Sequence, residues 1–252
     1  MRLNAAPLRE LPPVTRWLAG LFFAGWLAEM LFGVRLNVAF GLVPFLVTGQ
    51  FWLWQVFTYI FIHATFWHFF INTFMLWMLG RIVEPEMGSR KFLAYFLLCG
   101  AAAALFTLAW KPGSLTPVIG ASGAIFGLLG AFAFMHPDTT VYIYFILPMS
   151  ARTMAIVLGA IEFILTLSRP GSGISNVTHL GGLAAGLLWL WAERRWRERP
   201  VREAAPEPDP AAIEQAEIDR LLEKISRKGQ AALSGAEVTR LDEYARRKGG
   251  RA

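Results

Sequence analysis

The sequence predicts an all-α fold class: a polytopic membrane protein with a bundle of six transmembrane helices and a small soluble helical tail. Hydrophobic residues make up 55% of the 252 residues and charged residues only 17%, and the mean hydropathy is +0.45. This is too apolar for an ordinary soluble domain of that size. Charges are sparse between Arg16 and Trp191 but dominate from Glu193 onward. The chain therefore has two regimes, an apolar core and a polar tail.

Six apolar segments approach the roughly 20 residues that a helix needs to cross a bilayer. They are residues 16–33, 62–80, 91–110, 119–136, 151–168 and 176–193. We expect 1–15 to be a cytoplasmic N-terminus and 16–199 to be the membrane domain. Basic residues before the first segment indicate a retained helix and not a cleaved signal peptide.

The orientation of the bundle follows from its Lys and Arg residues, which concentrate on the cytoplasmic side of membrane proteins. One side of the predicted topology carries Arg2, Arg9, Arg16, Arg81, Arg90, Lys91, Arg152, Arg194, Arg195, Arg197 and Arg199. The other side carries only Arg35, Lys111 and Arg169. Both termini should be cytoplasmic, and the net charge of +6 reflects topology and not a nucleic-acid partner. The aromatic segment 34–61 should be a loop in the outer interface that forms a lateral wall.

Beyond the bundle, the Pro-rich residues 200–210 are expected to be a stiff linker. Residues 211–252 should form a soluble helical hairpin, in which Ser234 and Glu237 have the spacing of a capping box. Its apolar stripes either pack on each other or bind a protein partner. The lone Cys99 rules out an intrachain disulfide.

Polar residues gather at one depth of the predicted bundle. The second segment carries His63, His68 and Asn72 in its outer half, the fourth begins with Gly120-Ala121-Ser122-Gly123, and the sixth begins with His179. Such residues are costly in a bilayer and usually face the bundle interior or a wet cavity. The fourth and sixth segments should also approach closely, since pairs of glycines four apart form small-residue grooves. These pairs are Gly123 with Gly127 and Gly182 with Gly186.

Ser122 and His179 are a candidate nucleophile and general base. His68, Asn72 and the backbone N–H of Ser122 are candidate donors to an oxyanion, and Phe126, one turn below Ser122, could stack on His179. No Asp or Glu lies within these motifs, so the sequence favours a dyad. Glu162, in the fifth segment, is interpreted as a structural or gating hydrogen-bond partner in preference to a catalytic carboxylate. Each motif alone is weak, because small and polar residues commonly mediate packing in membrane helices.

With these residues in place, the chain resembles the rhomboid intramembrane proteases. His63-x4-His68-x3-Asn72, Gly120-x-Ser122-Gly123 and His179-x2-Gly182-x3-Gly186 match the three signature motifs of that family, over residues 16–193. The resemblance implies a Ser122 nucleophile, a His179 base, oxyanion donors on His68 and Asn72, and structural support from His63. Gly120, Gly123, Phe126, Gly182 and Gly186 would also support the site. The family often has Tyr where Phe126 stands, and the Trp-Arg pair that some members carry in the first loop is absent.

The resemblance implies a serine endopeptidase without a metal or organic cofactor. Its substrates would be single-pass membrane proteins that enter between the second and fifth spans, past a mobile cap. We expect an integral protein of a bacterial inner membrane with the active site toward the outer side. The tail resembles a short helical module behind some bacterial rhomboid cores. Two alternatives stay open: an inactive rhomboid-like protein that binds membrane clients, and a small transporter or proton channel.

Overall fold

The computed structural model describes residues 11–143, 147–168, 174–198 and 209–249. The chain divides into two compact units, residues 1–198 and residues 199–252. Most of the expected N-terminal segment and most of the expected linker lie outside the described residues. The described part of the first unit is a bundle of helices with one short β-hairpin, so the all-α fold class is confirmed.

Six helices of the core correspond to the six predicted segments. They are α1 (Pro13–Phe32), α5 (Phe66–Met87), α6 (Ser89–Trp110), α7 (Ser122–Met135), α8 (Ala151–Ser168) and α9 (Ile174–Arg197). Of the described helices, α5, α6 and α8 are long and apolar enough to cross a membrane, and α7 is a shorter apolar helix. These three helices make the chain an integral membrane protein, while the number of six crossings stays a prediction.

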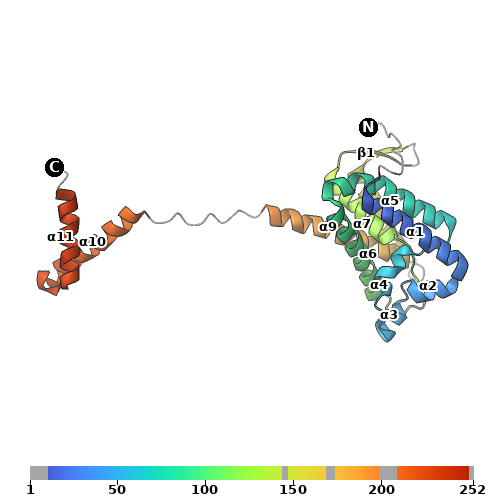
Figure 1. The fold of residues 1–252 in the computed structure, drawn as a ribbon. Coiled ribbons are helices and arrows are strands. Elements are labelled where there is room, and N and C mark those ends of the chain that lie inside the picture. The colour runs from blue at the N-terminus through green and yellow to red at the C-terminus, as the bar shows by residue number, and fades with distance from the viewer. Residues whose placement is uncertain (1–10, 144–146, 169–173, 199–208, 250–252) are drawn as a thin grey trace. The chain divides into compact units, whose positions relative to one another are not determined.

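Helix α7 lies at the centre of the bundle, packed against α5, α6, α8 and α9 (Figure 1). Nearly all of its residues from Gly123 to Ala133 are buried. Its 14 residues correspond to a length of about 21 Å at 1.5 Å per residue, whereas the hydrocarbon layer is about 30 Å thick. Helix α7 alone is therefore too short to cross that layer.

Two of the six helices, α5 and α7, begin a few residues later than predicted. Helix α5 begins at Phe66, because Thr65 caps it by accepting the backbone N–H of His68 at 3.1 Å. His63 therefore precedes the helix and does not lie in it. Helix α7 begins at Ser122, since Gly120 has a φ of +108° that no helical residue adopts. Gly120 and Ala121 form the turn that leads into α7.

The segment predicted as a loop, 34–61, folds into short helices at one end of the core (Figure 1). These are α2 (Val34–Phe40), α3 (Pro44–Gln50), α4 (Gln55–Thr58) and the 3₁₀ turn η2 (Tyr59–Phe61). The buried side chain of Gln55 holds them together. Its oxygen accepts the N–H of Val43 at 2.9 Å, and its nitrogen donates to the carbonyl of Val38 at 2.7 Å.

The opposite end of the core carries an unpredicted hairpin of β1 (Thr140–Ile143) and β2 (Leu147–Ser150), in which Val141 pairs with Met149 (Figure 1). Here also lies the carboxylate of Glu84, which is only 1% exposed. It accepts the N–H groups of Val14 and Thr15 and the hydroxyl groups of Thr15 and Ser89. Because the first N–H groups of a helix lack intrahelical partners, Glu84 caps α1 and ties it to α5 and α6.

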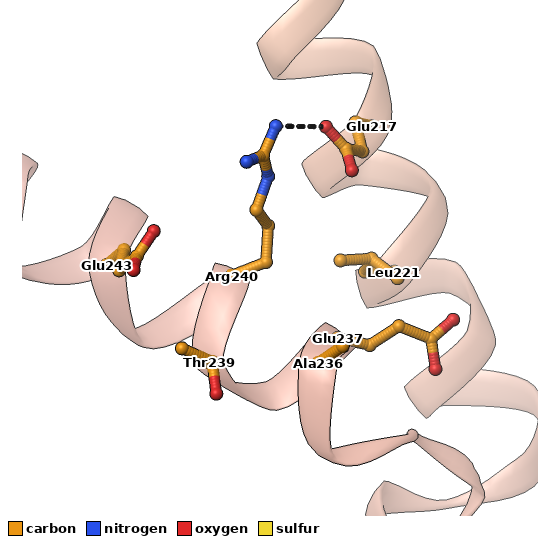
Figure 2. Close-up of a pocket in the computed structure, with 7 residues that line it drawn as sticks. All are labelled: Glu217, Leu221, Ala236, Glu237, Thr239, Arg240 and Glu243. Atoms are coloured by element: carbon orange, nitrogen blue, oxygen red, sulfur yellow. Dashed lines mark hydrogen bonds and ion pairs between the residues drawn. The ribbon is translucent and has the colours of Figure 1, made fainter.

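The described residues of the second unit form α10 (Pro210–Lys228), the 3₁₀ turn η3 (Gln230–Ala232) and α11 (Gly235–Gly249). The expected capping box is present: the N–H of Ser234 donates to Glu237 at 2.8 Å, and the N–H of Glu237 donates back to the Ser234 hydroxyl at 3.4 Å. Figure 2 shows Arg240 of α11 reaching Glu217 of α10, at 3.1 Å. Polar pairs of this kind join the two helices.

Candidate active site

The centre of the candidate site is a contact between a serine and a histidine from different helices. The Oγ atom of Ser122, the first residue of α7, lies 2.7 Å from Nε2 of His179 in α9. Both residues are partly buried. A serine hydroxyl at this distance from an imidazole nitrogen can transfer its proton to that nitrogen. The structure therefore brings together the two residues that the sequence singled out first.

Glycines allow the two helices to come this close. A β-carbon on Gly182 of α9 would overlap the carbonyl oxygen of Gly123 in α7, and one on Gly186 would lie 3.1 Å from the Cα atom of Gly127. The expected approach of these segments is therefore present, and its cause is direct backbone contact at small residues. Ser122 and His179 lie at the N-terminal end of this contact. Ser122 directly precedes Gly123, and His179 lies three residues before Gly182.

The imidazole of His179 is held from its face and from its second nitrogen. The ring of Phe126 stacks on it, with centroids 4.5 Å apart and an angle of 5° between the planes. On the opposite edge from Ser122, Nδ1 lies 2.9 Å from Oε1 of Glu162 in α8. The motifs themselves contain no carboxylate, so this acidic partner comes from a helix outside them.

Asn176 belongs to the same cluster and was missed in the sequence. Its side-chain nitrogen donates a hydrogen bond to Oε2 of Glu162, the oxygen that does not face His179. Its position three residues before His179 places the two on one helix face, and this spacing was the signal that could have identified it. Both carboxylate oxygens of Glu162 are thus bonded to α9.

His68 flanks the turn that precedes Ser122. A β-carbon on Gly120 would lie 2.6 Å from Cε1 of the His68 ring, so this imidazole packs directly on the glycine. The N–H of Gly120 donates to the carbonyl of Tyr59 at 2.9 Å, which fixes the turn against η2. Only glycine suits position 120, because the backbone there has a positive φ and the His68 ring leaves no room for a side chain.

Asn72 and His63, the other two members of this motif, both contact His68. The buried side-chain nitrogen of Asn72 donates to the backbone carbonyl of His68 at 2.8 Å. The fully buried ring of His63 lies edge-on to His68, with centroids 5.0 Å apart, and also 5.0 Å from the ring of Phe22 in α1. The three polar residues of this motif therefore form one group beside α7.

The backbone supplies further hydrogen-bond donors. The first intrahelical hydrogen bond of α7 joins the N–H of Ile125 to the carbonyl of Ala121. The N–H groups of Ser122 and Gly123 lie before this bond and are not part of the intrahelical hydrogen bonding of α7. The N-terminus of a helix carries a partial positive charge. A nucleophile, a base and donors to a developing oxyanion are the parts required for acyl transfer. Within the described ranges, no three His, Cys, Asp or Glu side chains are grouped to hold a metal ion.

Comparisons with known proteins agree with this geometry. Residues 50–196 match the model of the rhomboid domain. The chain is 30% identical to the mitochondrial rhomboid protein 1 of Saccharomyces cerevisiae over 57% of its own length and 44% of the relative's. It is 32% identical to the rhomboid protease GluP of Bacillus subtilis, over 60% and 28% of the two lengths, and 27% identical to the rhomboid protease GlpG of Salmonella typhi, over 75% and 66%.

The matched region covers less than half of the yeast relative and less than a third of GluP. Residues 211–247, which contain most of α10 and α11, match the model of a family of unknown function, DUF6576. The two units of the chain thus match separate family models.

Proposed function

Because this chain belongs to the rhomboid family, we propose that it is an intramembrane serine endopeptidase in which Ser122 is the nucleophile and His179 the general base. The observation that carries the proposal is the 2.7 Å contact between Ser122 Oγ and His179 Nε2 at the N-terminus of α7. Several of the relatives are named rhomboid proteases, which supports a hydrolase at the level of the family.

The proposed reaction follows from this contact. Nε2 of His179 takes the hydroxyl proton of Ser122 as Oγ bonds to the scissile carbonyl carbon and the carbonyl oxygen becomes an oxyanion. The C–N bond then breaks, and the imidazolium returns the proton to the leaving amine. Water then attacks the resulting ester while His179 takes its proton. The imidazolium returns this proton to Oγ as the ester C–O bond breaks, which releases the carboxylic acid and restores Ser122.

The oxyanion would be bound by the N-terminus of α7 together with His68 and Asn72. The N–H of Ser122 is the backbone donor in this proposal. Asn72 has two side-chain N–H bonds, and one of them donates to the carbonyl of His68. The second would serve the oxyanion, while the packing of His68 on Gly120 keeps its ring beside the nucleophile.

The substrates would be transmembrane segments that enter from the bilayer between α5 and α8. Large apolar side chains are exposed on both helices, among them Phe66, Trp67, Phe70, Ile156, Phe163 and Ile164. Such surfaces suit contact with lipid tails or with a transmembrane helix. By the distribution of Lys and Arg, the catalytic end would face the outer side of a bacterial inner membrane, with both termini in the cytoplasm.

Cleavage of a tagged single-pass membrane protein in liposomes tests this function. The wild type should cut it, whereas Ser122→Ala and His179→Ala should not. Ser150→Ala is the matched control, because Ser150 on β2 pairs with Thr140, which follows the C-terminal end of α7, whereas Ser122 begins that helix. Equal cleavage by all four proteins would refute the proposal. A folded wild type that cuts none of several substrates would favour the client-binding alternative.

A further inference from the structure

We propose that Glu162 is the third member of the catalytic group, a positioning residue that sets the orientation and tautomer of His179 in a Ser122–His179–Glu162 triad. The inference rests on the proposed function, and it departs from the dyad that the sequence motifs alone favour. Glu162 does not touch the substrate in this proposal; it acts through the imidazole.

The geometry has the features of a serine–histidine–acid triad. Glu162 Oε1, His179 Nδ1, His179 Nε2 and Ser122 Oγ follow one another at separations of 2.9 Å across the first gap and 2.7 Å across the second. The carboxylate and imidazole side chains are 15% and 18% exposed, so both are largely shielded. A carboxylate in such a position usually has a function, because placing it within a membrane bundle is costly.

The carboxylate is also anchored on its far side. Asn176 donates to Oε2 of Glu162, so Oε1 is directed at His179. Asn176 and His179 lie on the same face of α9, whereas Glu162 comes from α8. Position and direction of the carboxylate are thus set before any substrate arrives, which is what preorganisation requires.

This arrangement determines which nitrogen of His179 carries the proton at rest. A carboxylate can only accept, so Nδ1 must donate to it, and the lone pair of Nε2 then faces the hydroxyl of Ser122. When Nε2 takes the serine proton, the ring becomes positively charged, and the adjacent carboxylate stabilises that charge. Glu162 stays ionised throughout, and the proton moves only between Ser122, His179 and the leaving amine.

A packing role and a positioning role predict opposite orders for two substitutions. In Glu162→Gln the shape is kept, but Asn176 would hold the amide oxygen and turn the amide NH2 toward Nδ1. That group donates, so it would force the proton onto Nε2 and block the base. We therefore expect Glu162→Gln to lose at least as much activity as Glu162→Ala, although Gln is the closer replacement in shape and polarity.

The test is steady-state cleavage of a single-pass substrate by the purified full chain, with melting temperatures of every variant. We expect Glu162→Gln to lower kcat by about 100-fold or more with little change in KM, and Glu162→Asp to recover part of the loss. Asn176→Ala should cause a smaller loss, since it frees the carboxylate without removing it. Glu86→Gln is the matched control. Glu86 pairs with His136, at 2.8 Å, and not with any residue of the candidate site, so this substitution should leave kcat unchanged.

Each outcome decides the matter. Wild-type kcat in both Glu162→Gln and Glu162→Ala, with Ser122→Ala inactive, would overturn the triad and leave the protease intact. Cleavage that persists in Ser122→Ala would instead overturn the proposed function. If Glu162→Gln does not fold, Glu162→Ala carries the test, and wild-type kcat in that variant would overturn the triad.

Discussion

The backbones of α7 and α9 touch at Gly123 and Gly182. A β-carbon on Gly182 would overlap the carbonyl oxygen of Gly123, so the two helices are as close as their main chains permit. Ser122 is the neighbour of one glycine, and His179 lies three residues before the other. The 2.7 Å contact between nucleophile and base thus depends on the absence of two side chains.

Gly182→Ala should separate the helices and with them the two reacting residues. Neither backbone can yield locally, so we expect a loss of about 1–3 kcal/mol of unfolding free energy and an almost complete loss of cleavage. Thermal unfolding in detergent and a cleavage assay measure both. Gly20→Ala is the control, because no atom lies within 4 Å of a β-carbon built there. The two variants would behave alike if the contact had no such role.

Replacing Phe126 tests the stacked ring that faces His179. Phe126→Leu keeps apolar bulk but removes the stacking, which in aromatic pairs contributes about 0.5–1.5 kcal/mol. We therefore expect kcat to fall by about 2- to 10-fold. Phe126→Tyr keeps the ring and should retain wild-type kcat. An equal effect of Phe126→Leu and Phe126→Tyr would show that the stacking of the Phe126 ring, 5° from parallel to the imidazole, does not orient His179.

Glu84 should matter for stability more than for chemistry. Glu84→Ala would leave the N–H groups of Val14 and Thr15 and two hydroxyl groups without their acceptor in a buried place. We expect a loss of about 2–4 kcal/mol in the free energy of unfolding, measured by denaturation in detergent. Glu86→Gln, two residues further on and partly exposed, should cost far less. Equal losses would mean that the cap on α1 is unimportant.

The helical pair of the second unit should loosen in acid through Glu237. Its hydrogen bonds with Lys224, and then with Ser234, lower the pKa of this carboxyl from 4.5 to about 2. A lowered pKa means that the stabilisation is present above pH 4.5 and is lost as the pH falls toward about 2. Hydrogen exchange of α11 amides in the full chain, corrected for intrinsic rates, should rise over that window. Glu237→Gln should abolish the pH dependence, and an unchanged profile would exclude Glu237 as its source.

The sequence predicted where the helices run and which residues meet at one depth. Depth follows from counting residues along a helix, so the convergence of Ser122, His179 and His68 needed only the span boundaries. The close approach of α7 and α9 was likewise evident from glycines spaced four apart. These features depend on periodicity and composition, which a single sequence contains.

The contact between Glu162 and His179 could not be predicted in the same way. It depends on how α8 is rotated about its own axis against α9, and packing of the whole bundle sets that rotation. The sequence assigned Glu162 a hydrogen bond but no partner.

The start of α5 and the β-hairpin could have been predicted. Thr65 is a typical N-cap residue, and Thr140 and Val141 are β-branched residues that favour strands. Both signals were present but were outweighed by the apolar residues around them.

Labelling by a fluorophosphonate, a reagent that reacts with activated serines, tests whether Ser122 is the nucleophile of the full chain in detergent. Peptide mass spectrometry should place the adduct on Ser122, and His179→Ala should lose the labelling while keeping its melting temperature. An adduct on another serine, or equal labelling of Ser122 in His179→Ala, would mean that Ser122 is not a nucleophile activated by His179.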